Sequence, residues 1–195
     1  MTVLASAVAF VDLETTGTSA TGDRVTEVAI VRVVDGEVIE EWSSLVDPER
    51  SIPPDIQILT GITNESVKGA PTFAEIRNEV RERLEGHLFV AHNARFDYGF
   101  LKNEFARLEM PFSADVLCTV RLSRRLYPDA VGHSLDALIA RHGLCDPQDV
   151  VAGGARTGRH SALGDARALL RFSRVIEREK PAEEIAAAVK RLLKI

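Results

Sequence analysis

Four acidic residues and one histidine have types and spacings that could do chemistry together. Asp12 and Glu14 follow an apolar run, and residues two apart on a strand point to the same side, so both carboxylates are expected on one face. Asp97 comes shortly after another apolar run, at 88–91. His160 and Asp165 would lie about 140° apart on one helix, because each residue turns a helix by about 100°. We therefore expect Asp165 on a helix and His160 on the loop before it.

Each of these residues also has a purely structural explanation. The acid pair after the first apolar run could cap a strand ahead of a turn. Asn93 and Ser161 are expected as helix N-caps, which puts Asp97 and Asp165 in first helical turns, where the helix dipole favours a carboxylate. The histidine could be an exposed loop residue. What argues for a site is that all five stand at a predicted strand end or helix start.

Taken together, the four carboxylates indicate a site for hard cations. Carboxylate oxygens with few competing nitrogens suit Mg²⁺ or Mn²⁺ and not zinc. Two such ions about 3.5–4 Å apart would neutralise the acids and clamp an in-line phosphoryl displacement. Asp12 and Glu14 could share one ion. A histidine with an ordinary pKa of about 6.5 could take a proton from an attacking water near neutral pH.

Three segments carry a family resemblance. VDLETTG at 11–17, HNARFD at 92–97 and H-x4-D at 160–165 resemble, in this order, the three motifs of the DEDDh (DnaQ-like) 3′→5′ exonucleases. The pattern is similar to that of the epsilon proofreading subunit of bacterial DNA polymerase III. LTGIT at 59–63 and GHSLDAL at 132–138 also resemble this family. Any one motif is a weak signal, whereas the three in order are specific.

The resemblance covers about residues 5–178 and all five catalytic positions match. It implies a ribonuclease H-like fold and removal of nucleoside monophosphates from 3′ ends by hydrolysis with two divalent ions, Mg²⁺ or Mn²⁺. The residues that it implies for catalysis are Asp12, Glu14, Asp97 and Asp165 as metal ligands and His160 as general base. The residues that it implies for substrate are Leu13, Thr15, Thr16 and Ile62 around the terminal nucleotide and its base, and His92, Asn93 and Phe96 beside the second nucleotide or its phosphate.

The substrate and partners are expected by the same resemblance. Single-stranded 3′ ends of DNA are expected, in proofreading or repair, with a DNA polymerase or a fused module of a longer protein as partner. Trimming of RNA 3′ ends is the alternative, because recognition of a 2′-hydroxyl cannot be read from these residues. A non-catalytic accessory module is a further alternative, which the intact acids and histidine disfavour.

The elements that must position these residues follow from apolar patterning. Apolar runs rich in β-branched residues predict strands at 7–13, 25–34, 37–46, 88–91 and 115–118. Helical patterns predict helices at 72–85, 94–108, 119–127, 134–142, 161–180 and 182–193. Asp35-Gly36 predicts a hairpin between the second and third strands. A hairpin followed by strand–helix–strand units predicts an α/β fold, a central five-stranded mixed sheet flanked by helices.

The exonuclease-like domain is expected at 1–180, followed by an amphipathic helix at 181–195 that packs on it or docks a partner. Residues 47–54 are expected as a proline-bearing loop, and the glycine-rich 146–159 as a mobile one that lets the histidine order when substrate binds. Glu27 interrupts an apolar strand, and its side chain could face solvent or the acids.

Composition narrows the classes of protein. With 195 residues, 45% of them hydrophobic and 27% charged, the chain has ordinary globular composition, and no apolar run approaches the ~20 residues of a membrane span. Two cysteines cannot form a disulfide framework, so a cytoplasmic location is expected. Lys and Arg total 24 against 29 Asp and Glu, a net charge of −5, which argues against coating nucleic acid by bulk electrostatics.

Overall fold

A computed structural model describes residues 4–144 and 161–193, and the structural statements below concern these ranges. The described elements are, in chain order, β1 (Ala7–Thr15), β2 (Val25–Val34), β3 (Glu37–Leu45), α1 (Pro54–Thr60), α2 (Phe73–Leu84), β4 (Leu88–Ala91), α3 (Arg95–Arg107), β5 (Val116–Cys118), α4 (Thr119–Leu126), α5 (Leu135–His142), α6 (Ala162–Glu179) and α7 (Ala182–Leu192). The predicted glycine-rich loop at 146–159 and His160 lie outside the described residues.

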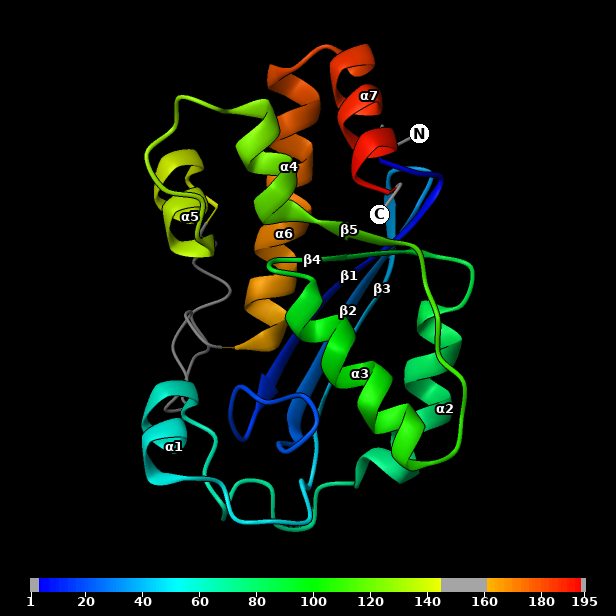
Figure 1. The fold of residues 1–195 in the computed structure, drawn as a ribbon, viewed down its shortest axis with the longest axis vertical. Coiled ribbons are helices and arrows are strands. Elements are labelled where there is room, and N and C mark those ends of the chain that lie inside the picture. Colours follow the sequence, from blue (N-terminus) through cyan, green and yellow to red (C-terminus); the bar gives the residue numbers. More distant parts are fainter. Residues whose placement is uncertain (1–3, 145–160, 194–195) are drawn as a thin grey trace.

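The strands form one five-stranded mixed sheet in the order β3-β2-β1-β4-β5 (Figure 1). β1 lies in the centre, antiparallel to β2 and parallel to β4. β2 and β3 form the predicted hairpin, whose turn residues Asp35 and Gly36 both have positive φ, 50° and 94°. Two such residues match the tight turn that follows the twist of the strands. The predicted α/β architecture is confirmed.

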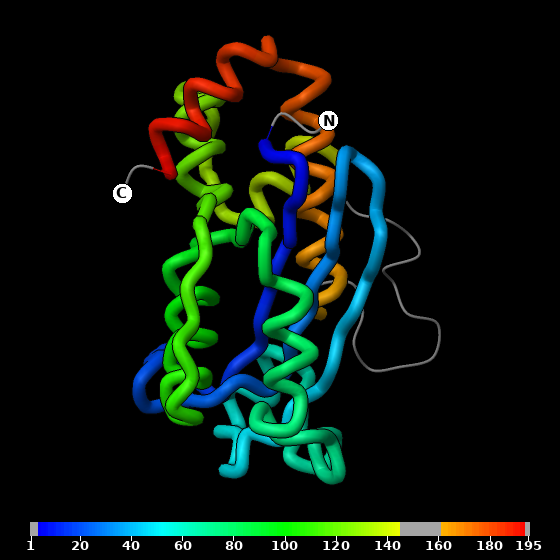
Figure 2. Tube along the Cα trace, turned by 90° about the vertical axis from the view of Figure 1, so that its right-hand side faces the viewer, coloured from blue at the N-terminus to red at the C-terminus, as the bar shows by residue number. Residues whose placement is uncertain are grey.

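Alternation along β1 divides the core into two layers. Val8 and Phe10 face a cluster formed with α4, α5, α6 and α7. Ala9, Val11 and Leu13 face the opposite cluster, formed with α2 and α3. Figure 2 shows helices packed on both sides of the sheet, with the described chain ends at the end of the molecule where α7 lies. The sheet is therefore covered on both faces.

The C-terminal helix α7 packs on this domain. Its Ile185, Ala188 and Val189 are buried in the cluster beneath α4 and α6. These three residues recur at helical spacing, which explains why one face of the helix is apolar.

Helix α1 was missed by the sequence patterns, which left this segment without an element. Pro54 occupies the first helical position and Gly61 ends the helix with φ 70°. Proline fits the first position because the amide hydrogen it lacks has no helical partner there, and glycine readily adopts the left-handed end. With only seven residues, α1 shows too little periodicity to be recognised from apolar spacing alone.

Candidate active site

Asp12 and Glu14 lie at the carboxyl end of the central strand β1, on the face that α6 covers. They continue the alternation of Val8 and Phe10, which pack beneath α6. Both side chains are half-buried. Because β1 is paired with β2 at both residues, its backbone holds the two carboxylates in a fixed spacing.

Asp97 reaches the same end of β1 from the first turn of α3. It is buried, with 3% of its surface exposed. Burial raises its pKa to about 7, against hydrogen bonds from its own amide and from the amide of Leu13, which lower the pKa. The Leu13 contact joins the start of α3 to β1 between the two acids of that strand.

The predicted capping role of Asn93 is wrong. Asn93 has φ 59°, in the left-handed region, and its carbonyl accepts a hydrogen bond of 2.8 Å from the Phe96 amide. Ala94 is the N-cap, and no side chain caps the helix. A capping asparagine needs an extended backbone, which the tight turn after β4 does not allow. Asp97 nevertheless lies in the first helical turn, as predicted.

Asp165 comes from the first turn of α6 and is also buried, with 7% exposed. The pKa of Asp12 is raised well above its usual value, first by burial and then by the charges of Asp97, Asp165, Glu14 and Glu27. The structure therefore brings the four acids that the sequence singled out into one electrostatic neighbourhood. Like charges gathered this way favour either protonation or a bound cation.

Glu27 is the fifth acid of this neighbourhood, and the sequence left its orientation open. It lies on β2 directly across from Glu14 and has 7% of its surface exposed. Its Oε2 accepts a hydrogen bond of 3.2 Å from the Ala162 amide at the start of α6. The sequence signal for a role of Glu27 was the presence of an acid within an apolar strand.

The donor set fits a hard divalent cation. Carboxylate oxygens suit Mg²⁺ or Mn²⁺, and a cation would offset both the burial and the mutual repulsion that raise the pKa of Asp12. Within the described ranges, no three histidine, cysteine or acidic side chains already form a metal-binding group.

The predicted substrate residues at the carboxyl end of β1 and directly after it are buried. Leu13 packs in the core on the α3 side. The Thr15 hydroxyl donates to the carbonyl of Gly17 at 2.6 Å. The Thr16 hydroxyl accepts from the Arg24 amide at 3.0 Å. These threonines shape the turn between β1 and β2, which follows the acids.

This turn is fastened to α3 by an ion network around one buried acid. Glu104 of α3 has 1% exposure and accepts hydrogen bonds from Arg24 Nε at 2.9 Å and from the Val25 amide at 3.2 Å. Arg107 lies 3.3 Å from Glu104. Arg107 also donates to the turn carbonyls of Ala20, Thr21 and Asp23. The helix that carries Asp97 thus holds the loop that follows Asp12 and Glu14.

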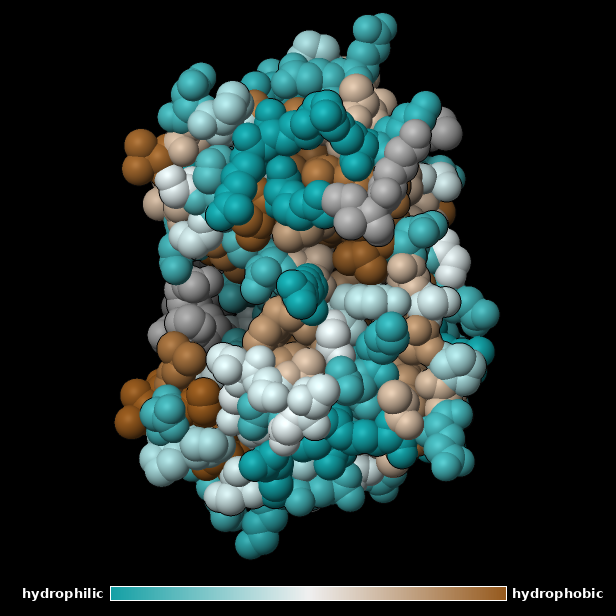
Figure 3. Space-filling model, in the orientation of Figure 1, coloured by the Kyte–Doolittle hydropathy of each residue, from teal (hydrophilic) through white to brown (hydrophobic). Residues whose placement is uncertain are grey.

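The predicted contact of Ile62 with a base is not supported by its position. Ile62 is 0% exposed and packs in a small cluster with Ile52 and Val67. The exposed apolar residues of this segment are Ile58 and Leu59 on α1, at 86% and 56%. Figure 3 shows brown side chains at the surface over α1. The short helix turns Ile58 and Leu59 outward, whereas Thr60 and Ile62 are buried as the chain turns back into the core.

His92, Asn93 and Phe96 follow β4 at the same end of the sheet. β4 is parallel to β1 and pairs Val90 with Phe10, so the residues after it come level with Asp12. His92 Nδ1 lies 2.9 Å from the Thr119 hydroxyl. Asn93 is exposed and Phe96 half-buried. These three are therefore near the acids.

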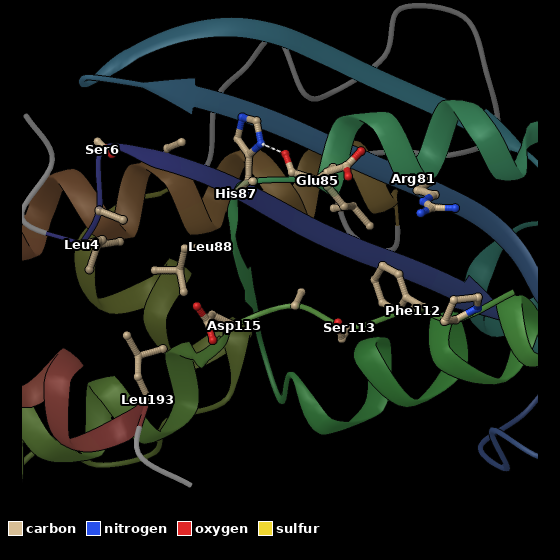
Figure 4. A pocket seen from close by; sticks show the side chains of 16 residues that line it. Leu4, Ser6, Arg81, Glu85, His87, Leu88, Phe112, Ser113, Asp115 and Leu193 are labelled. Atoms are coloured by element: carbon tan, nitrogen blue, oxygen red, sulfur yellow. Dashed lines mark hydrogen bonds between the residues drawn. The ribbon is translucent and has the colours of Figure 1, made fainter.

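A pocket of about 600 Å³ lies at the opposite end of the sheet (Figure 4). It is lined by the amino ends of β1 and β4, with Arg81, His87, Asp115 and Leu193 around it. His87 Nδ1 lies 2.8 Å from the carbonyl of Glu85. Because parallel strands present their carboxyl ends at the other edge, this pocket is separate from the acids.

The fold and the acids together define an exonuclease domain, and comparison with known proteins agrees. The sequence model of the exonuclease family matches residues 9–172. The chain belongs to this family, which confirms the resemblance to epsilon-like 3′→5′ exonucleases and the predicted enzyme class.

Named relatives are similar over much of the chain. DNA polymerase III PolC-type from Clostridium perfringens is 37% identical over 165 residues, 83% of this chain and 11% of that protein. A DNA polymerase III subunit epsilon-like protein from Rhodobacter capsulatus is 40% identical over 168 residues, covering 83% and 23%. The 3′-5′ exonuclease DinG from Bacillus subtilis is 40% identical over 131 residues, covering 66% and 14%. The chain thus spans a quarter or less of the length of each of these relatives.

Solved structures agree on the fold. Exonuclease X in complex with 5′ overhanging duplex DNA is 26% identical, with a TM-score of 0.68, covering 93% of this chain and 99% of that one. E. coli exonuclease I in complex with single-stranded DNA has a TM-score of 0.75 at 18% identity, covering 94% and 42%, a likeness of fold. The ribonuclease H-like architecture is confirmed. None of the helices among the described residues is long and apolar enough to cross a membrane.

Proposed function

We propose that this chain removes nucleotides one at a time from 3′ ends of DNA, by metal-dependent hydrolysis, in proofreading or repair. The observation that carries the proposal is the placement of four acids: Asp12 and Glu14 at the end of β1, and one acid from the first turn of each of α3 and α6. Burial and the charges of these neighbours together raise the pKa of Asp12. Four carboxylates gathered at one strand end, in an exonuclease-family domain, fit a metal-dependent hydrolase better than a scaffold.

The proposed metal ligands are Asp12, Glu14, Asp97 and Asp165. When bound, two Mg²⁺ or Mn²⁺ ions supply positive charge beside the scissile phosphate and activate the attacking water. The backbone positions three of these ligands: β2 pairs with β1 at Asp12 and Glu14, and the Leu13 amide donates a hydrogen bond to the Asp97 carboxylate. Cation binding keeps these carboxylates ionised despite their burial.

His160 is proposed as the general base that takes a proton from the attacking water. It lies two residues before the first residue of α6 and five before Asp165, so the start of that helix determines where it can reach. An imidazole with an ordinary pKa of about 6.5 is mostly neutral at physiological pH and can accept a proton.

The proposed substrate is a 3′ end of DNA, and the relatives support this choice. Their names include a polymerase III epsilon-like protein, PolC-type polymerases and the exonuclease DinG, and Exonuclease X was solved with a 5′ overhanging duplex DNA. We propose His92, Asn93 and Phe96 as contacts for the second nucleotide or its phosphate, and Leu13, Thr15 and Thr16 as the walls of the terminal pocket. Because the chain spans so little of these relatives, association with or fusion to a DNA polymerase is also a proposal.

The test is digestion of 5′-labelled single-stranded DNA and RNA of one sequence, with Mg²⁺, Mn²⁺ or EDTA. We expect a ladder that shortens from the 3′ end of DNA and disappears in EDTA. Faster shortening of the RNA would establish the RNA-trimming alternative. Internal cuts in a circular strand, or full activity in EDTA, would refute the proposal.

The matched variants are Asp12→Ala and Asp129→Ala. Asp12→Ala should lose metal binding, measured by calorimetry with Mn²⁺, together with activity, because the central ligand is removed. Asp129 is an exposed acid in the loop after α4, so its alanine variant should retain both. Equal activity of the two variants would exclude Asp12 from the reaction.

A further inference from the structure

The helix α6 begins without a cap of its own. Ser161 occupies the N-cap position with an extended backbone, φ −106° and ψ 119°, yet its side chain makes no capping hydrogen bond. A serine in this position usually accepts a bond from an amide of the first turn, which otherwise lacks a helical partner. The first amide of α6 is instead bonded by Glu27, which lies 135 positions earlier in the sequence.

Glu27 is held rigidly enough to act as this cap. It lies on β2, which is paired with β1 on one side and with β3 on the other. Its partner Ala162 is 0% exposed, as is Ala166 one turn later, so α6 approaches the sheet closely on small side chains. The 3.2 Å bond from the Ala162 amide to Glu27 Oε2 therefore links two buried segments.

A buried carboxylate beside other acids is unfavourable unless something offsets its charge. Glu27 contributes to the raised pKa of Asp12, so it lies within reach of the site's negative charge. The amino end of a helix carries partial positive charge and stabilises a carboxylate placed against it. An apolar residue at position 27 would avoid the repulsion, but it could not bond the Ala162 amide.

We propose that Glu27 is a positioning residue for catalysis: it caps α6 from the sheet and so fixes Asp165, three residues further along, beside Asp12. The inference rests on the proposed function, in which Asp165 is a metal ligand. Without the cap, the first turn of α6 frays, and Asp165 spends less time where it can bind a cation. Glu27 itself needs only an acceptor oxygen at the right distance.

Three substitutions separate this role from that of an additional metal ligand. Glu27→Gln keeps the length and one acceptor oxygen but removes the charge. Glu27→Asp keeps the charge but shortens the side chain by one methylene. Glu27→Ala removes both. Ser161→Ala is the matched control, since the Ser161 side chain makes no capping bond to α6.

If Glu27 acts as a cap, the activities of its variants should follow a different order than if it acts through its charge. Glu27→Gln and Ser161→Ala should keep kcat within about threefold of the wild type, because the bond to the Ala162 amide can still form. Glu27→Asp and Glu27→Ala should lose roughly 10- to 100-fold in kcat, the usual effect of removing a group that orients a metal ligand. KM should change less than kcat. The reverse order, with aspartate active and glutamine inactive, would overturn the proposal, as would full activity of the alanine variant.

Two measurements test the inference without relying on activity. Hydrogen exchange of the amides at 162–165 should become faster in the aspartate and alanine variants and stay protected in the glutamine variant. Calorimetry with Mn²⁺ should show weaker binding by roughly 10- to 100-fold in the same two variants. Unchanged exchange in all three would refute the cap. A wild type that binds Mn²⁺ but leaves DNA intact would refute the proposed function alone, since exchange and metal binding would still test Glu27.

Discussion

Helices α3 and α6 do the same task by different means. Each contributes one buried acid from its first turn to the carboxyl end of β1, Asp97 from one layer and Asp165 from the other. On the α3 side the helix is fastened by charge, since Glu104 binds an arginine of the β1–β2 connection, the first amide of β2 and an arginine of α3 itself. The position of Asp97 is thus tied to an ion network.

The α6 side is fastened mainly by apolar packing. Ala162, Ala166, Leu169 and Phe172 are each 0% exposed beneath this helix. The ion pair from Arg167 to Glu41, at 2.5 Å, joins side chains that are 29% and 33% exposed. Two helices can thus position equivalent acids while being held by different forces. Different perturbations should therefore destabilise them.

The largest effect on activity is expected at the two acids, where the α3 and α6 sides are equivalent. Asp97→Asn and Asp165→Asn should each lower kcat/KM on the order of a thousandfold, since a lost metal ligand costs several kcal/mol of transition-state stabilisation. The measurement is release of the 3′ nucleotide at saturating Mg²⁺. If one variant kept more than a tenth of the activity, the two acids would not be equivalent ligands.

The next effect should distinguish the two sides. Glu104→Gln keeps the shape but removes the charge that pairs with Arg24 and Arg107, so the free energy of unfolding should fall by about 2–3 kcal/mol. Urea unfolding measures this change, and Glu109→Gln, at an exposed position just after the same helix, is the control. A loss no larger than that of the control would show that the network does not anchor α3.

Measuring the stability of the metal-free protein against pH should show how strongly burial disfavours the ionised acids. The pKa of Asp97 is raised to about 7 in the folded protein, above its value of about 3.9 when unfolded, so folding favours the protonated acid. Its stabilising contribution is present below about pH 4 and is lost as the pH rises through about 7.

Without metal, the free energy of unfolding should therefore fall as the pH rises from about 4 to about 7. Added Mg²⁺ should restore this stability above about pH 7 and should have no such effect below about pH 4, where the acid is protonated. Thermal unfolding in EDTA, with and without excess Mg²⁺, measures the difference. The Asp97→Asn variant should show a flatter dependence on pH, and an unchanged dependence would assign the effect to other groups.

The smallest effect is expected at the surface of α6. Arg167→Ala should change the free energy of unfolding by less than about 1 kcal/mol, because partly exposed ion pairs contribute little. The same urea measurement applies. A loss as large as that of Glu104→Gln would remove the contrast between the two helices.

The sequence predicted local features well. Asp35-Gly36 forms the hairpin turn, and Thr72 with Glu75 forms a reciprocal cap at the start of α2. Strand β2 has the predicted limits, and the remaining strands and the helices from α2 onward lie within two residues of theirs. These features depend on residues close together in the chain, which is why periodicity and turn chemistry suffice.

Long-range contacts explain what the sequence could not supply. The bond between Glu27 and Ala162 joins residues 135 positions apart, and that between Arg24 and Glu104 joins residues 80 apart. The burial of Ile62 could not be predicted for the same reason. Its cluster with Ile52 and Val67 forms only when the segment folds back. The motifs identified which acids matter, whereas the groups that hold them are visible only in three dimensions.

The central place of β1 in the sheet has a consequence for how the molecule opens. Its amides from residue 8 to residue 10 are flanked by strands on both sides, and β2 continues alongside the residues that follow. Such amides exchange with solvent chiefly through whole-molecule unfolding, whereas edge strands such as β3 open by small local fluctuations. Asp12 and Glu14 directly follow this protected stretch and remain paired with β2, so the spacing between them should survive partial opening of the helices around them.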